Sequence, residues 1–147
     1  MNELNFGKLH MKIDLLNRQI EDRNKPYLDW LVCNVVVSLP NFKGQFRWSV
    51  MPSELESLAA DLNMMYTEFP TPSKFTFEPV EPNIVLSFEL TPTGQIIGSF
   101  AFYPDFREEQ VLKGSFDIDQ SYLPGIIESI RTLLKSSIDK IEKIGNS

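Results

Sequence analysis

The sequence predicts an α+β domain with one antiparallel sheet of about six to seven strands and two amphipathic helices packed on one face of that sheet. Short segments of the chain alternate apolar and polar residues, which is the period of half-buried strands. Two longer segments carry apolar residues at helical spacing. The strands follow one another after short connections, which favours antiparallel pairing because parallel pairs need long crossovers. The expected order is three strands, a helix, four strands and a helix.

The first three expected strands lie before residue 51. Residues 9–15 alternate strictly, with Leu9, Met11, Ile13 and Leu15 on one face. Residues 30–39 are apolar on one face and partly apolar on the other, so this strand is expected to be central or covered on both sides. Residues 46–50 alternate again, and Pro40 and Gly44 flank the link before them as in a hairpin.

The first helix is expected to begin at Ser53. Ser53 and Glu56 have the spacing of a capping box, in which each side chain satisfies a free backbone N–H of the first turn. Pro70 and Pro72 end the helix because proline lacks an amide donor. Its apolar stripe consists of Leu55, Leu58, Ala59, Leu62, Met65 and Phe69.

Four more strands and a second helix follow. The strands are expected within residues 75–77, 84–90, 96–102 and 112–118, with a tight turn at residues 91–94, where Gly94 supplies a positive φ. Ser121 is a suitable N-cap for the last helix, and Pro124 is tolerated in its first turn. The apolar stripe of this helix runs from Leu123 to Ile141.

Composition indicates one domain over residues 1–147, with residues 1–5 and 143–147 frayed. The net charge of −6 repels phosphate backbones, so nucleic acid is not an expected partner, whereas a basic protein would be attracted. The first residues lack the features of a signal peptide, and the apolar runs are too short to span a membrane. A cytoplasmic protein without a membrane partner is therefore expected.

The residue inventory predicts no catalytic, cofactor or metal site. His10 is the one histidine and lies on the polar side of its strand, while Cys33 lies in an apolar run. Asp117 and Asp119 share a strand face and would suit a raised pKa or a hard cation. The favoured interpretation is structural: Asp117 is solvated, and Asp119 lies near a helix N-terminus where negative charge is stabilising.

Acidic side chains gather in two predicted loops. Such carboxylates are solvated charge by default, but they would also suit a basic partner. The candidate partner-binding residues are Glu78, Glu81, Asp105, Glu108 and Glu109.

Several segments together resemble the WapI-type family of small, largely uncharacterised bacterial immunity-like proteins. The matching segments are Asp29-Trp30-Leu31, the link at residues 40–44, the helix from Ser53, the strand at residues 84–90 with the glycine of the next hairpin arm, and residues 116–124 (FDIDQSYLP). The resemblance covers about residues 29–134. It implies a protein that neutralises a cognate toxin by binding its toxic domain, and it carries over no binding residues.

The leading hypothesis is thus a non-enzymatic immunity or interaction protein with a basic toxin as its partner. One alternative is a module that binds a small molecule or peptide on the sheet face or in a pocket under the helices. A further alternative is an enzyme that depends on carboxylates. The sequence leaves open whether the protein is a monomer or a homodimer.

Overall fold

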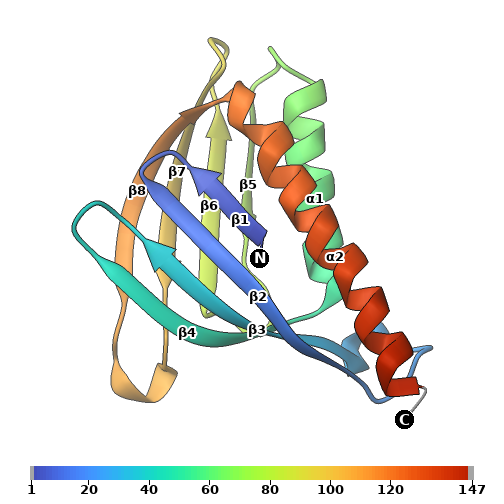
Figure 1. The fold of residues 1–147 in the computed structure, drawn as a ribbon. Coiled ribbons are helices and arrows are strands. Elements are labelled where there is room, and N and C mark those ends of the chain that lie inside the picture. Colours follow the sequence, from blue (N-terminus) through green and yellow to red (C-terminus); the bar gives the residue numbers. More distant parts are fainter. Residues whose placement is uncertain (1, 146–147) are drawn as a thin grey trace.

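The computed structural model describes residues 2–145, except for the side chains of Phe106 and of residues 140–145. The first sheet has the order β1 (Asn2–Phe6), β2 (Leu9–Ile20), β3 (Asp29–Ser38) and β4 (Lys43–Val50). The second has the order β5 (Ser73–Phe77), β6 (Ile84–Leu90), β7 (Gln95–Phe102) and β8 (Leu112–Asp119). Each sheet is followed by one helix, α1 (Pro52–Thr67) and α2 (Leu123–Gly145), as Figure 1 shows.

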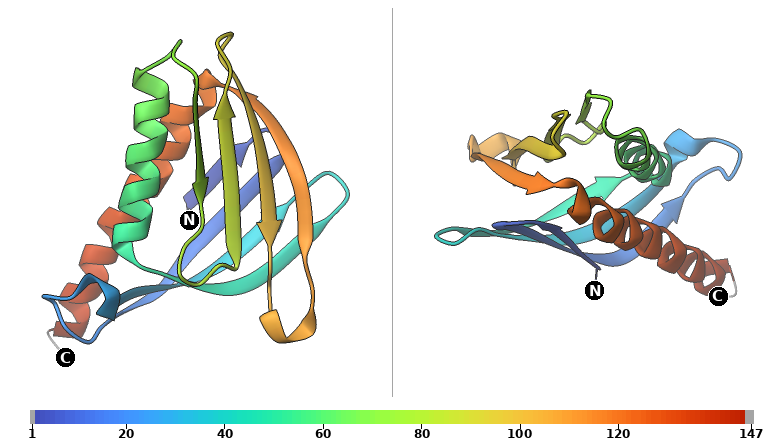
Figure 2. Two further views of the ribbon diagram at one scale, coloured as in Figure 1. Left: turned by 180° about the vertical axis from the view of Figure 1, so that it is seen from behind. Right: turned by 90° about the horizontal axis from the view of Figure 1, so that it is seen from above.

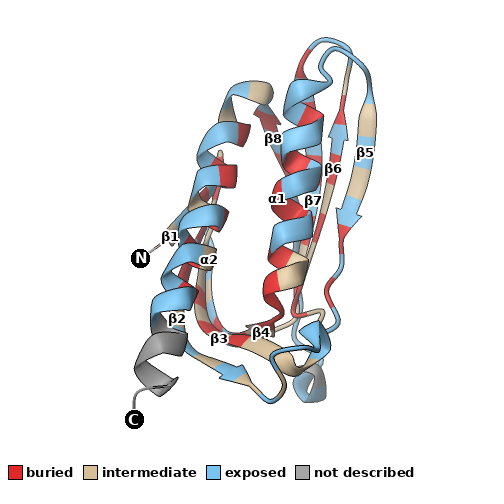
Figure 3. Cartoon of the chain, turned by 90° about the vertical axis from the view of Figure 1, so that its right-hand side faces the viewer, coloured by how far each residue is buried: buried red, intermediate tan, exposed pale blue. Residues whose placement is uncertain are grey.

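The two sheets face each other, and both helices lie along the side where the sheets diverge (Figure 2). Aromatic side chains from the inner faces meet between the sheets. The ring of Phe6 lies 5.0 Å from that of Phe116, and Trp48 meets Phe77 edge to face at 6.2 Å. The buried residues in Figure 3 accordingly line the inner faces of the sheets and the helix faces turned toward them.

The prediction of a single sheet with both helices on one face was wrong. All antiparallel pairs lie within residues 2–50 or within residues 73–119. Alternation shows which side chains of a strand are buried, but it does not show whether they meet a helix or a second sheet. Here α1 carries the chain from one sheet to the other, so the inner faces cover each other.

The strand at residues 2–6 was not predicted, because only Leu4 and Phe6 alternate there. Gly7 has a φ of 80° and closes a tight turn that returns the chain into β2. The other expected strands are present, and β3 lies inside its sheet between β2 and β4, as its apolar pattern predicted. Of the ends expected to be frayed, residue 1 and residues 146–147 lie outside the described residues.

The first helix begins one residue earlier than predicted and is capped differently. Pro52 occupies its first turn, where the missing N–H costs nothing. The carboxylate of Glu54 accepts the backbone N–H of Met51 at 3.0 Å, so Glu54 takes the place expected for Glu56. The predicted stripe is buried from Leu55 to Met65, whereas Phe69 lies beyond the helix end and is partly exposed.

The corner between β8 and α2 joins four parts of the fold. Asp119 accepts the backbone N–H of Ser121 at 2.8 Å and so caps a short 3-10 turn, Gln120–Tyr122, that precedes α2. The backbone N–H of Gln120 donates to the Gly94 carbonyl at 3.1 Å, and its side-chain amide donates to the Tyr66 carbonyl at 2.9 Å. The corner therefore fixes the β6–β7 turn and the end of α1 against the start of α2.

Among the described side chains of α2, the buried stripe runs from Leu123 to Ser137, and the side chain of Ile141, predicted to continue it, lies outside the described residues. Ile138, which the helical spacing placed on the apolar face, is 53% exposed. No helix in the described part of the chain has the length and apolar content needed to cross a membrane.

Candidate partner-binding surface

The two acidic loops predicted as partner-binding elements lie at the same end of the second sheet. Ile84 at the start of β6 pairs with Phe102 at the end of β7, so the loops before and after these residues are neighbours. The backbone N–H of Tyr103 donates to the Asn83 carbonyl at 2.9 Å, and the Asn83 side chain returns a bond of 2.8 Å to the Tyr103 carbonyl. Figure 2 (left) shows both loops at the lower end of the sheet.

We call this surface, formed by residues 78–83 and 103–111, the acidic end. An antiparallel meander places alternate loops at one end, so the strand order contained a signal for their proximity that the sequence analysis did not use. The acidic end brings together all five candidate residues, Glu78, Glu81, Asp105, Glu108 and Glu109.

The first acidic loop has a fixed backbone and exposed side chains. The backbone N–H of Val80 donates to the Glu54 carboxylate at 2.7 Å, and the indole of Trp48 donates to the Glu81 carbonyl at 3.1 Å. The carboxylates of Glu78 and Glu81 are exposed, and Val80 is 66% exposed between them. A partner would meet a preformed loop that presents an apolar residue flanked by negative charge.

The second loop contains an ion pair between Asp105 and Arg107. Asp105 accepts the backbone N–H of Arg107 at 2.9 Å and bonds its guanidinium at 3.2 and 3.1 Å, which holds the pKa of the Asp105 carboxyl below its ordinary value. Glu108 and Glu109 are exposed and form no ion pair among the described side chains. Val111 is 48% exposed, so the second loop also presents an apolar side chain beside its carboxylates, as Val80 does in the first loop.

A surface groove of about 290 Å³ adjoins the acidic end. It runs between α1 and β5, and its floor is formed by the buried side chains of Leu58 and Phe77. Exposed carboxylates of Asp61, from α1, and Glu78, just after β5, lie along it. The groove thus continues the negative charge of the acidic end along the edge of the second sheet.

A much smaller cavity lies in the core between the sheets and the helices. The cavity lined by residues such as Met11, Trp48 and Leu133 measures only about 10 Å³, which is about the volume needed by one water molecule.

The carboxylates that sequence reasoning weighed for catalysis have structural partners. Asp117 accepts a hydrogen bond from the Gln95 side chain, and Asp119 is the cap described above. The bonds from the hydroxyl and backbone of Ser121 lower the pKa of the Asp119 carboxyl. Among the described residues, no group of three or more His, Cys, Asp and Glu side chains is arranged to hold a metal ion.

His10 and Cys33 lie on opposite faces of the first sheet and do not form a pair. His10 is partly exposed, and its Nδ1 lies 2.6 Å from the Glu3 carboxylate on the neighbouring strand. Cys33 is buried in the core, and burial, assisted by the negative charge of Asp14, raises the pKa of its thiol to about 12. Its thiol is therefore protonated at neutral pH and a poor nucleophile.

The chain matches one known protein family over most of its length. The model of the immunity protein WapI-like family matches residues 4–136. The chain belongs to the WapI-like immunity protein family. The matched residues include both sheets, α1, the acidic end and most of α2, so the family match covers the whole packed core of this WapI-like protein.

Two solved plant structures share a distant likeness with the WapI-like chain. The plant transcriptional regulator PBF-2 is 6% identical, with a TM-score of 0.46 over 95% of this chain and 82% of that chain. WHY1 from Arabidopsis thaliana is 12% identical, with a TM-score of 0.41 over 96% of this chain and 89% of that chain. At these values neither likeness bears on what this chain binds. No curated protein matches the chain.

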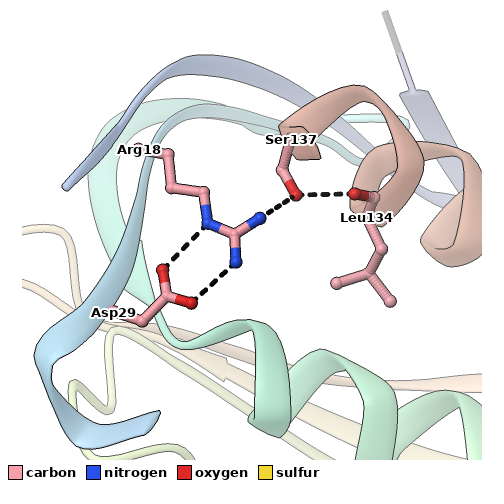
Figure 4. Close-up of polar contacts among 4 residues, drawn as sticks. All are labelled: Arg18, Asp29, Leu134 and Ser137. Carbon is pink, nitrogen blue, oxygen red and sulfur yellow. Dashed lines mark hydrogen bonds and ion pairs between the residues drawn. The ribbon is translucent and has the colours of Figure 1, made fainter. Parts of the chain in front are cut away.

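Asp29, in the segment Asp29-Trp30-Leu31 that resembles the family, pairs with Arg18, and the sequence did not predict this pair. The Arg18 guanidinium donates to both Asp29 oxygens, at 2.9 and 2.7 Å, and also to the Ser137 hydroxyl at 2.9 Å (Figure 4). Ser137 in turn donates to the Leu134 carbonyl at 2.6 Å. This network fastens the far end of the β2–β3 hairpin to α2, away from the acidic end.

Proposed function

We propose that this WapI-like protein is a non-enzymatic immunity protein that binds a basic toxin domain through the acidic end and thereby neutralises it. The observation that carries the proposal is the convergence of two acidic loops, which the β6–β7 hairpin separates in sequence, on one end of the second sheet. Family membership supports the immunity role, and the cytoplasmic location expected from the sequence is part of the proposal.

The composition of the acidic end fits a protein interface. Protein interfaces combine an apolar centre with a polar rim, and here Val80 and Val111 are exposed beside the acidic side chains. Arg107 offsets the charge of Asp105, so Glu108 and Glu109 supply unpaired negative charge on that loop. Exposed charges of this kind chiefly raise the association rate and make it dependent on salt.

The test measures association of the protein with the toxic domain encoded beside its gene. We expect the variant Glu108→Lys/Glu109→Lys to associate about tenfold or more slowly at low salt, because it reverses two charges at the acidic end. The matched control is Glu128→Lys/Asp139→Lys, which makes the same change of net charge at exposed positions on α2. Surface plasmon resonance at several ionic strengths measures the association and dissociation rates separately.

The proposal requires the loop variant to lose association rate while the α2 control keeps it. Equal rates for both variants would show that the acidic end is not the contact surface. Circular dichroism of each variant checks that the fold is retained.

A further inference from the structure

β5 is a strand edge left open beside the groove. The second sheet has the order β5-β6-β7-β8, so β5 pairs on one side only. The edge of the first sheet at β1 is covered differently, because the Ser129 hydroxyl of α2 donates to the Glu3 carbonyl there at 2.8 Å. Figure 3 shows β5 at the margin of the molecule. Lys74 and Thr76 of this strand are exposed, Ser73 and Phe75 are partly exposed, and Phe77 is buried.

The groove beside β5 combines an apolar floor with acidic walls. Leu58 and Phe77 form the floor and are 3% and 8% exposed, respectively. Asp61 lies on the helix side, and Glu78 lies at the end of the strand. Glu54 also borders the groove, but its two oxygens already accept backbone N–H groups of Met51 and Val80.

A lysine or arginine side chain matches both features of this groove. Its aliphatic stem can cover the apolar floor while its cation approaches the exposed carboxylates. An extended backbone beside β5 would supply the hydrogen-bonding partners that an edge strand lacks. Strand addition of this kind takes its affinity from main-chain bonds and its specificity from alternate side chains.

We infer that the open edge of β5 and the groove receive an extended basic segment of the partner as an added strand. The inference rests on the proposed function, because it takes the partner to be a basic protein. It adds a second, sequence-selective contact to the acidic end, in which lysine or arginine at alternate positions of the partner strand faces the groove. β5 has five residues, so the added segment is about five to six residues long.

The direct test uses a synthetic peptide, acetyl-Val-Lys-Val-Lys-Val-Lys-amide, added to the ¹⁵N-labelled protein. We expect NMR shift changes at amides of Ser73–Phe77 and of residues 53–61, with a dissociation constant below about 1 mM. A peptide of the same sequence and charge, N-methylated at every residue, has no backbone N–H donors for strand pairing on either edge. It should bind at least tenfold more weakly.

Three outcomes with the wild-type protein overturn the inference. They are equal binding of the N-methylated peptide, shift changes confined to residues 103–111, and no shift changes at millimolar peptide. Asp61→Lys should weaken binding of the unmodified peptide about tenfold, whereas Asp139→Lys on α2 should not. Unchanged binding by Asp61→Lys also counts against the groove.

The toxic domain distinguishes failure of this inference from failure of the proposed function. If Asp61→Lys binds the domain normally while Glu108→Lys/Glu109→Lys binds it slowly, the groove is excluded and the acidic end stands. If Asp61→Lys loses affinity for the domain as it does for the peptide, the groove is part of the interface.

Discussion

Gly98 on β7 is the position where a single added methyl group is expected to harm the fold most directly. Gly98 pairs with Phe116 on β8, and the Phe116 ring lies over the glycine. A Cβ built on Gly98 would lie 2.0 Å from the Cζ atom of Phe116. The ring cannot move away freely, because it packs against Phe6 at 5.0 Å and Phe88 at 5.5 Å. Gly98→Ala therefore forces either the strand or the aromatic cluster to shift.

The expected cost of Gly98→Ala is about 1–3 kcal/mol in the free energy of unfolding, the range for overpacking a well-filled core. Gly98 does not have a positive φ, so the alanine backbone itself is unstrained. Without the ring, alanine should stabilise the fold by about 0.4–1 kcal/mol, because it reduces the entropy of the unfolded chain. The sign of the effect thus depends on Phe116.

Urea denaturation of four proteins measures this dependence: the wild type, Gly98→Ala, Phe116→Leu and the double variant. We expect Gly98→Ala to destabilise the wild type and to be neutral or stabilising in the Phe116→Leu background. Gly125→Ala in α2 is the control, since a Cβ there meets nothing within 4 Å, and it should stabilise the protein by up to about 1 kcal/mol. The same cost of Gly98→Ala in both backgrounds would refute the ring contact as its cause.

Three further predictions concern single side chains. Arg18→Met should lower the free energy of unfolding, measured by urea denaturation, by about 2–4 kcal/mol, because it leaves the half-buried Asp29 carboxylate unpaired. The double variant Arg18→Met/Asp29→Leu should recover most of that loss. If the losses of the two single variants simply add, the pairing is not the cause. Burial raises the pKa of the Cys33 thiol to about 12 from 9.0, so the contribution of the protonated thiol to stability is fully present below pH 9 and is lost as the pH rises from 9 toward 12, by roughly 1 kcal/mol per pH unit. Cys33→Ala should lack this loss, and parallel pH profiles of stability for the two proteins would contradict the prediction. Glu54→Ala should speed hydrogen exchange at the Val80 amide about tenfold or more, whereas unchanged exchange would mean that Glu54 does not hold the loop.

The sequence predicted the positions of most elements because burial leaves a local period. Alternation located the core of each strand from β2 to β8, and helical spacing identified both helices. The arrangement of the strands in two sheets was not predictable in this way. The side chains of Phe6 and Phe116 meet across 110 positions of the chain, and nothing local at either residue specifies that contact.

The candidate site was predictable in composition but not in geometry. Two loops rich in carboxylates were evident from the sequence, as was the structural use of Asp119. The bond from Val80 to Glu54 joins a loop to a helix 26 positions away, and it emerges only after α1 is placed beside β5. The groove was not predictable either. Its floor is formed by Leu58 of α1 and Phe77 of β5, and the sequence pattern predicts each of these only as a core residue.

The most direct test of the central claim is coexpression of this protein with a candidate toxic domain, sought among the products of the genes beside its own. The account predicts that growth is restored, that the two proteins copurify as a one-to-one complex, and that Glu108→Lys/Glu109→Lys weakens both effects while Glu128→Lys/Asp139→Lys does not. Continued toxicity without a complex would contradict the immunity function for that pair, and protection that is insensitive to the loop variant would contradict the acidic end as the binding surface.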